Sequence, residues 1–305
     1  MKKQISIFLA AYFCLRIFSY FFSPGTPLYL ANPINWIISI LVLLFTTYYL
    51  LLRNDERGWL IIAGELILGG AGNFLEIKGV SLRTLLLVSS MAIFAYQTIK
   101  EKKYKILLEN KIIIYIFLSL YAIGGMSALR GYYLGNDIKL ILAATTPYLF
   151  FFFYFPFKEL WLSEKFRQTS FSMLIAAVIG NFIFTYFTLA GFSSGIFILQ
   201  DAYYHWFRDV ASGKITDYGT EFFRILTNEQ LLVVPLFLWL SAKKINETNT
   251  KNYILKISRA ALLAILTINI TRIYLVALAV GILSLFSVKN WKRWLAYSAG
   301  ALIFF

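Results

Sequence analysis

The sequence predicts an all-α membrane protein, a polytopic transmembrane helical bundle, and two observations support this. Hydrophobic residues make up 59% of the 305 residues, and aromatic residues make up 18%. Apolar runs of helical length recur along the chain, separated by short charged loops. Because backbone polar groups at membrane depth find no water, such runs favour helices, which satisfy those groups internally.

The apolar runs predict about 10–11 spans, since a span needs about 20 mostly apolar residues. The last run stops at Phe305, so we expect this chain to be C-terminally truncated and residues 1–305 to form a single bundle that continues beyond it. In order, the predicted spans are 4–23, 33–52, 58–76, 83–99, 112–129, 138–157, 169–191, 229–242, 254–270, 272–288 and the incomplete 294–305.

The basic residues predict the orientation of these spans. With a cytoplasmic N-terminus, 20 of the 29 lysines and arginines fall on the inner side, 8 fall on the outer side, and Arg16 lies within a span. Positive charge concentrates on the cytoplasmic side of membrane proteins, so this bias supports that orientation. The net charge of +14 is therefore a topology signal, and the sequence lacks the basic helix expected for nucleic-acid binding.

Residues 254–288 predict a helical hairpin that carries Arg272. This arginine is the only charge between Ala260 and Val288. A single helix of 35 residues would be about 52 Å long, far more than a hydrocarbon core of about 30 Å. A turn near Asn269 keeps the following lysines inside and brings Arg272 to the outer surface of the bundle.

The longest connection, 192–228, is predicted to lie outside as an aromatic loop with an interfacial helix. It contains Tyr203, Tyr204, Trp206 and Phe207. Aromatic rings with polar tips favour the membrane–water interface, so this segment is expected to lie flat there.

Three arginines are predicted at the outer membrane edge: Arg130 after the fifth span, Arg224 before the eighth, and Arg272 in the hairpin. A guanidinium stays charged at any working pH and binds phosphate oxygens through two parallel bonds. These groups therefore suit a diphosphate at the outer leaflet. The alternative is that each side chain reaches outward to lipid headgroups.

The segment before the eighth span has two interpretations. Thr227 as N-cap with Gln230 three residues later predicts a capping box, with Glu229 favourable in the first helical turn. We favour this over a catalytic base at Glu229. Glu221 has no such explanation and is a candidate to pair with an arginine or to accept a proton.

Two further charges fall inside spans, Arg16 in the first and Glu65 in the third. Intramembrane charges are functional candidates, but we favour a simple pair between these two over a proton or substrate path. His205 is interpreted as a surface histidine. With a single histidine and a distant Cys14, the sequence predicts no metal site and no cofactor.

The order of these features resembles the O-antigen polymerase and O-antigen ligase superfamily of bacterial envelope glycan enzymes. The likeness is carried by residues 129–137 (LRGYYLGND), 223–231 (FRILTNEQL) and 266–278 (LTINITRIYLVAL). Glu229 departs from the family pattern, where proline is common. The family's large external loop, which carries the base in ligases, would lie beyond Phe305, so His205 does not inherit that role.

The resemblance implies glycosyl transfer at the outer face of the bacterial inner membrane, by a polymerase in preference to a ligase. The donor would be an undecaprenyl-diphosphate-linked glycan, the acceptor a second glycan, and a chain-length regulator protein a further partner. Arg130, Arg224 and Arg272 would bind the diphosphate, and Glu221 would be a candidate base. The alternative is a transporter or flippase of a lipid-linked or anionic substrate that uses Glu65 and Arg16; it would need an internal repeat, and we find none.

Overall fold

The computed structural model describes residues 2–27, 33–70, 72–102, 111–219, 222–242, 249–269 and 272–284 and is mostly helical. The coarse prediction of a helical multi-pass membrane protein is confirmed. Span number, orientation and truncation stay predictions, and the span at 294–305 lies outside the described residues. Six helices in these ranges are long and apolar enough to cross a membrane: Lys2–Phe22, Ile34–Leu52, Leu82–Lys100, Ile112–Tyr133, Leu140–Leu160 and Glu164–Ser193.

The chain divides into two compact units, each of which is described by itself. Unit 1 comprises Met1–Ile34, Leu66–Phe74 and Phe171–Phe305, and unit 2 comprises Asn35–Glu65 and Leu75–Ser170. Whether the two form the single predicted bundle stays a prediction.

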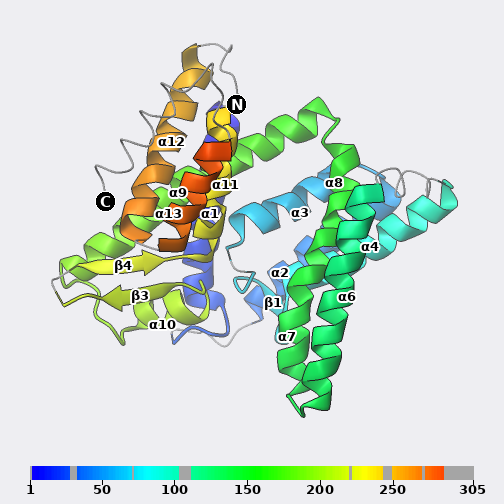
Figure 1. Cartoon of the computed structure of the whole chain (residues 1–305), viewed down its shortest axis with the longest axis horizontal. Helices are drawn as coiled ribbons and strands as arrows, with labels where there is room; N and C mark the ends of the chain where they lie inside the picture. Colours follow the sequence, from blue (N-terminus) through cyan, green and yellow to red (C-terminus); the bar gives the residue numbers. More distant parts are fainter. Residues whose placement is uncertain are drawn as a thin grey trace. The chain divides into compact units, whose positions relative to one another are not determined.

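Unit 1 combines helices with a small β-hairpin (Figure 1). The predicted hairpin segment 254–288 is described as two helices, α12 and α13, with Arg272 as the first residue of α13. The elements are α1 (Lys2–Phe22), most of α9 (Glu164–Ser193), α10 (Ala202–Asp209), β3 (Lys214–Asp217), β4 (Phe223–Leu226), the 3₁₀ turn η3 (Asn228–Leu232), α11 (Val233–Ala242), α12 (Asn249–Asn269) and α13 (Arg272–Ser284).

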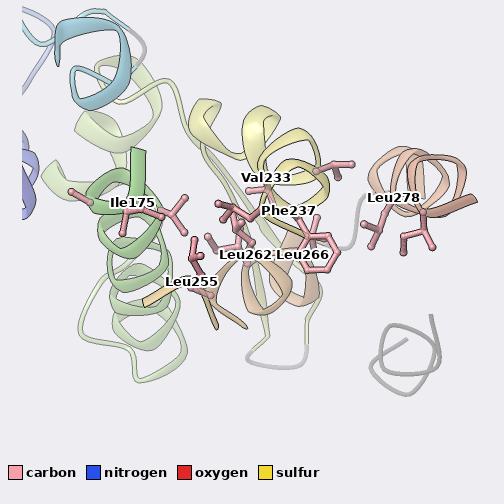
Figure 2. Close-up of a cluster of buried hydrophobic side chains, with 14 of the residues drawn as sticks. Ile175, Val233, Phe237, Leu255, Leu262, Leu266 and Leu278 are labelled. Carbon is pink, nitrogen blue, oxygen red and sulfur yellow. The ribbon is translucent and has the colours of Figure 1, made fainter. Parts of the chain in front are cut away.

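An aliphatic core holds the helices of unit 1 together. Figure 2 shows Phe237 of α11 and Leu262 and Leu266 of α12 in this cluster, with Leu278 contributed by α13. Leu262, Ile265 and Leu266 are buried at the spacing of one helix face, which is why α12 packs along that face. The cluster packs α11, α12 and α13 against one another.

A second, aromatic cluster holds α10 against α1 and α9. Trp206 and Phe207 are buried, and the Trp206 indole donates to the Ser19 hydroxyl of α1 at 3.1 Å. The segment predicted to lie flat at the interface therefore directs these two rings into unit 1. Gly180 of α9 is required for this packing, because a Cβ there would lie 2.6 Å from the Tyr12 ring.

The antiparallel hairpin β3–β4 is a feature that the sequence prediction missed. It pairs Thr216 with Arg224 and Ile215 with Ile225, and Gly219 in its turn has a φ of +75°. Ile215 and Ile225 are buried on one face, which anchors the hairpin to the aromatic cluster. The hairpin thereby places Arg224 on a strand of defined register.

Unit 2 consists of the remaining helices and a minimal hairpin. The predicted span 58–76 differs from the structure, because α3 ends at Leu68, before Gly70 at a φ of +60°. The predicted span 138–157 overlaps the apolar helical segment Leu140–Leu160, in which Pro147 lies inside α7 and a 3₁₀ turn follows at Phe150. The elements are α2 (Ile34–Thr47), the π-helical turn η1 (Tyr48–Leu52), α3 (Glu56–Leu68), β1 (Glu76–Ile77), β2 (Val80–Ser81), α4 (Leu82–Lys100), α6 (Lys111–Tyr133), α7 (Ile138–Leu149), η2 (Phe150–Phe153), α8 (Tyr154–Leu160) and the start of α9.

Candidate functional site

Two of the three predicted arginines belong to unit 1. Arg224 lies in β4 and is partly buried, and Arg272 is the first residue of α13. Arg130 lies in the last turn of α6 in unit 2 and is exposed. Convergence of Arg130 with the other two therefore stays a prediction, and Glu221 lies outside the described residues.

Arg224 is tied directly to the end of α12. Its Nε donates to the backbone carbonyl of Asn269 at 2.7 Å. Asn269 ends α12, and Arg272 follows three positions later, so their Cα atoms lie within about 11 Å of each other. The structure thus brings the β4 arginine to the place where α12 ends and α13 begins.

A buried polar network lies next to this junction. The Asn269 amide donates to Gln230 Oε1 at 2.6 Å, and the Gln230 amide donates to the Thr185 hydroxyl at 3.4 Å and to the Ile225 carbonyl at 3.2 Å. The hydroxyls of Thr185 and Thr227 both donate to Asn181 Oδ1. All of these polar side chains are buried, so their mutual bonds offset the cost of removing them from water.

The network corrects the predicted capping box. Thr227 is the N-cap of η3, but its side chain makes no capping bond and instead binds Asn181 of α9. The Gln230 backbone N–H donates to the Thr227 carbonyl, while its side chain bonds to Asn269. Both polar side chains have long-range partners here, and these compete successfully with the local cap.

The expected pair between Arg16 and Glu65 is wrong. Arg16 forms a salt bridge with Glu229 and also donates to the carbonyls of Tyr12 and Leu68, at 3.1 and 3.4 Å. Its guanidinium carbon lies 3.3 Å from the centre of the Tyr12 ring. Side-chain exposure is 4% for Arg16 and 14% for Glu229, so this ion pair is largely desolvated. It adjoins the polar network because Glu229 directly precedes Gln230 in the chain.

Glu65 pairs with Arg83 in unit 2. Arg83 Nε lies 2.7 Å from Glu65 Oε2, and a second guanidinium nitrogen donates to the Glu65 carbonyl at 3.0 Å. The short β1–β2 hairpin between α3 and α4 returns the chain so that these residues meet. Both intramembrane candidates are therefore charges with an assigned structural partner.

His205 belongs to a surface cluster on α10. Arg208 donates two bonds to Asp209, at 2.7 and 2.8 Å, and lies 3.3 Å from His205 Nδ1. The hydrogen bond from Arg208 holds the pKa of the Asp209 carboxyl below its usual value. These side chains are partly or fully exposed, in agreement with the interpretation of His205 as a surface histidine.

Sequence reasoning missed Asn181, Gln230 and Asn269 as parts of the site. The signal was present, because each is an amide side chain inside or at the edge of an apolar helix, where polar groups require partners. No three His, Cys, Asp or Glu side chains gather within the described ranges in a way that could hold a metal ion. The expectation of no cofactor stays a prediction.

The described site therefore consists of Arg224, the start of α13, the buried amide network and the Arg16–Glu229 pair. Comparisons of the chain with protein-family models, curated proteins and solved structures find no match.

Proposed function

We propose that this protein transfers a glycosyl group from a polyisoprenyl-diphosphate donor to a glycan acceptor at the outer face of the bacterial inner membrane, as a polymerase in preference to a ligase. The observation that carries the proposal is the bond between Arg224 and Asn269, which brings Arg224 to the junction where Arg272 begins α13. In this proposal the guanidinium groups of Arg224 and Arg272 both balance the charge of a diphosphate at this junction.

The start of α13 adds to this preference for an anion. The first N–H groups of a helix lack intrahelical partners and carry a partial positive charge. α13 has 13 residues and begins at Arg272. A phosphate at this end would therefore meet backbone donors and arginine side chains together.

In the proposed reaction an acceptor hydroxyl attacks the anomeric carbon of the donor sugar. A new carbon–oxygen bond forms, the bond from the anomeric carbon to the diphosphate oxygen breaks, and the bonding electrons leave with the diphosphate. The acceptor proton passes to a base, for which Glu221 stays a candidate. Arg224 and Arg272 stabilise the charge that develops on the leaving diphosphate, where fixed charges contribute most to rate.

The polar network and the Arg16–Glu229 pair would act as supports for this site. The Asn269 side chain donates a hydrogen bond to Gln230, and the Asn269 backbone carbonyl accepts one from Arg224. Arg16 lies in the last two turns of α1, which the predicted topology directs outward, and it fixes Glu229 five positions after Arg224. Arg16 and Glu65, which the transporter alternative would use, each pair with a different residue, so nothing among the described residues favours that alternative.

The test is replacement of Arg272 by alanine and by lysine in the protein in its bacterial membrane. Losing one such positive contact to a leaving group typically lowers the rate by about 10²–10³. We expect both variants to lose long-chain glycan on a gel, because lysine supplies charge without the two-pronged guanidinium contact. Protein abundance in the membrane is measured in parallel.

Arg208→Ala is the matched control, because Arg208 is an exposed arginine of α10 that bonds to Asp209 and lies outside the described site. We expect it to retain glycan synthesis. Normal chain length in both Arg272 variants would refute the proposed role of the arginines.

A further inference from the structure

We infer that a pocket in unit 2 binds a small organic amine, with the ammonium group at the mouth of the pocket and an apolar body in its interior. The pocket is lined by residues of α3, α4 and α8 and of the adjoining turns, and its volume is about 300 Å³ (Figure 1). Ligand pockets begin at about this size. The predicted topology places these turns on the cytoplasmic side. The inference goes beyond the proposed function and does not depend on it.

Side-chain contacts join the walls of the pocket. The Ser163 hydroxyl, in the turn before α9, donates to the Glu56 carboxylate of α3 at 2.8 Å. The Trp59 ring of α3 lies edge to face with Phe94 of α4 and Phe157 of α8, with 6.2 and 6.1 Å between ring centres. These contacts hold the three helices around the pocket before any ligand binds, which lowers the cost of binding.

The mouth of the pocket is acidic. Glu101 at the end of α4 and Glu159 of α8 both line it, and both are exposed. None of the described lining residues is basic, although the chain has a net charge of +14. Within the described ranges no group of three His, Cys, Asp or Glu side chains could hold a metal ion. The two carboxylates therefore favour an organic cation.

The interior of the pocket combines apolar walls with two polar groups. Trp59, Thr98 and Pro156 line the pocket and are buried. Only 7% of Trp59 and 9% of Thr98 is exposed, and in the described part of the chain neither the indole N–H nor the hydroxyl has a hydrogen-bond partner. Buried polar groups are rarely left without partners. These two therefore point to a ligand whose inner end carries a hydroxyl, which can accept from the indole.

The order of these groups favours a free amine over a lysine side chain of another protein. A lysine would enter with its ammonium first and carry the charge past Glu101 and Glu159 into apolar surroundings, where a charge is costly. A free amine can keep its ammonium at the mouth while its body fills the interior. A primary ammonium suits the mouth better than a quaternary one, because it donates hydrogen bonds to the carboxylates.

The test measures binding to the purified full chain in detergent micelles by titration calorimetry, with tyramine as the probe. Tyramine carries an ammonium group, an aromatic ring and a phenol hydroxyl. Phenethylamine lacks the hydroxyl, and 4-ethylphenol lacks the ammonium. We expect tyramine to bind and each of the other two to bind at least about threefold more weakly, because each loses hydrogen bonds to the pocket. Partition into micelles would instead favour the less polar phenethylamine.

Variants of the pocket separate its two ends. Glu101→Gln and Glu159→Gln should each lower tyramine affinity by about twofold to fivefold, as expected for exposed charge pairs, and should leave 4-ethylphenol binding unchanged. Thr98→Val removes the hydroxyl at nearly constant shape and should lower affinity for tyramine but not for phenethylamine. Thr98→Ser keeps a hydroxyl and should retain tyramine affinity.

Glu164→Gln is the matched control. It removes the same charge from an exposed side chain next to Ser163 that pairs with Arg167 and does not line the pocket. Tyramine affinity should stay unchanged. An equal loss in Glu164→Gln would show that general surface charge attracts the amine, and would overturn the inference. Unchanged affinity in both Glu101→Gln and Glu159→Gln, or no binding of millimolar tyramine to the unmodified protein, would overturn it as well.

Discussion

The two units each contain a largely buried arginine–glutamate pair, and the pairs differ in how the chain brings them together. Arg83 and Glu65 of unit 2 are 18 positions apart, whereas Arg16 and Glu229 of unit 1 are 213 positions apart. The first pair follows from a short hairpin between consecutive helices. The second exists only if α1 and the segment before α11 have already come together.

Their surroundings differ as well. Arg83 donates one hydrogen bond to the Glu65 carboxylate and another to the Glu65 backbone carbonyl. Arg16 instead stacks on the Tyr12 ring, with Phe184 and Phe74 at 5.2 and 5.4 Å. Within the described residues its Nε has no hydrogen-bond partner. Arg16 also donates to the carbonyls of Tyr12 and Leu68, but its side chain is less exposed than that of Arg83, so its charge depends more heavily on its acidic partner.

The largest effect is therefore expected from Glu229→Ala. It leaves Arg16 buried without a counter-charge, and removing one partner of a buried pair costs about 3–5 kcal/mol of unfolding free energy. Denaturant unfolding in detergent measures this loss. The double variant Arg16→Met with Glu229→Leu should recover much of it, because no unpaired charge then stays buried. A double variant no more stable than Glu229→Ala would contradict this account.

Glu65→Gln should cost less, about 1–3 kcal/mol, in the same measurement. The amide keeps an oxygen that can accept a bond from Arg83, and the bond from Arg83 to the residue 65 carbonyl is unaffected. Side-chain exposure is 17% for Arg83 and 4% for Arg16, so solvent stabilises more of the Arg83 charge that Glu65→Gln leaves without a carboxylate. A loss as large as that of Glu229→Ala would remove the distinction between the two pairs.

The same comparison explains which features were predictable from the sequence. Apolar runs reveal helices at membrane depth because burial and length suffice to define them, and the six long helices follow the predicted runs. The helical ends were less predictable. Thr227 and Gln230 satisfy a local capping pattern, yet their side chains bond to Asn181 and Asn269 from other helices.

The site shows the same limit. That Arg16 and Glu65 each need a partner follows from the cost of an intramembrane charge, but the identity of the partner depends on tertiary packing. The β3–β4 hairpin was missed because its strands have four residues each, and its buried Ile215 and Ile225 were interpreted only as part of an aromatic loop. Arg224 was nevertheless identified, since a guanidinium next to an apolar span is a signal that needs no knowledge of the fold.

A third pair, Glu56 with Lys165 in unit 2, provides an exposed counterpart to the two largely buried arginine–glutamate pairs. The two lie 2.9 Å apart, but 65% of the Lys165 side chain is exposed. Hydrogen bonds from Lys165 and then Ser163 lower the pKa of the Glu56 carboxyl. The stabilisation is therefore present above the carboxyl's unfolded pKa of about 4.3 and is lost as pH falls through the lower folded value.

Lys165→Ala should lower the free energy of unfolding by less than about 1 kcal/mol at neutral pH, because an exposed pair is screened by solvent. The difference from the unmodified protein, measured by denaturant unfolding from pH 7 downward, should shrink below about pH 4. A difference that stays constant would show that Lys165 stabilises the chain through its aliphatic contacts rather than through the carboxylate of Glu56.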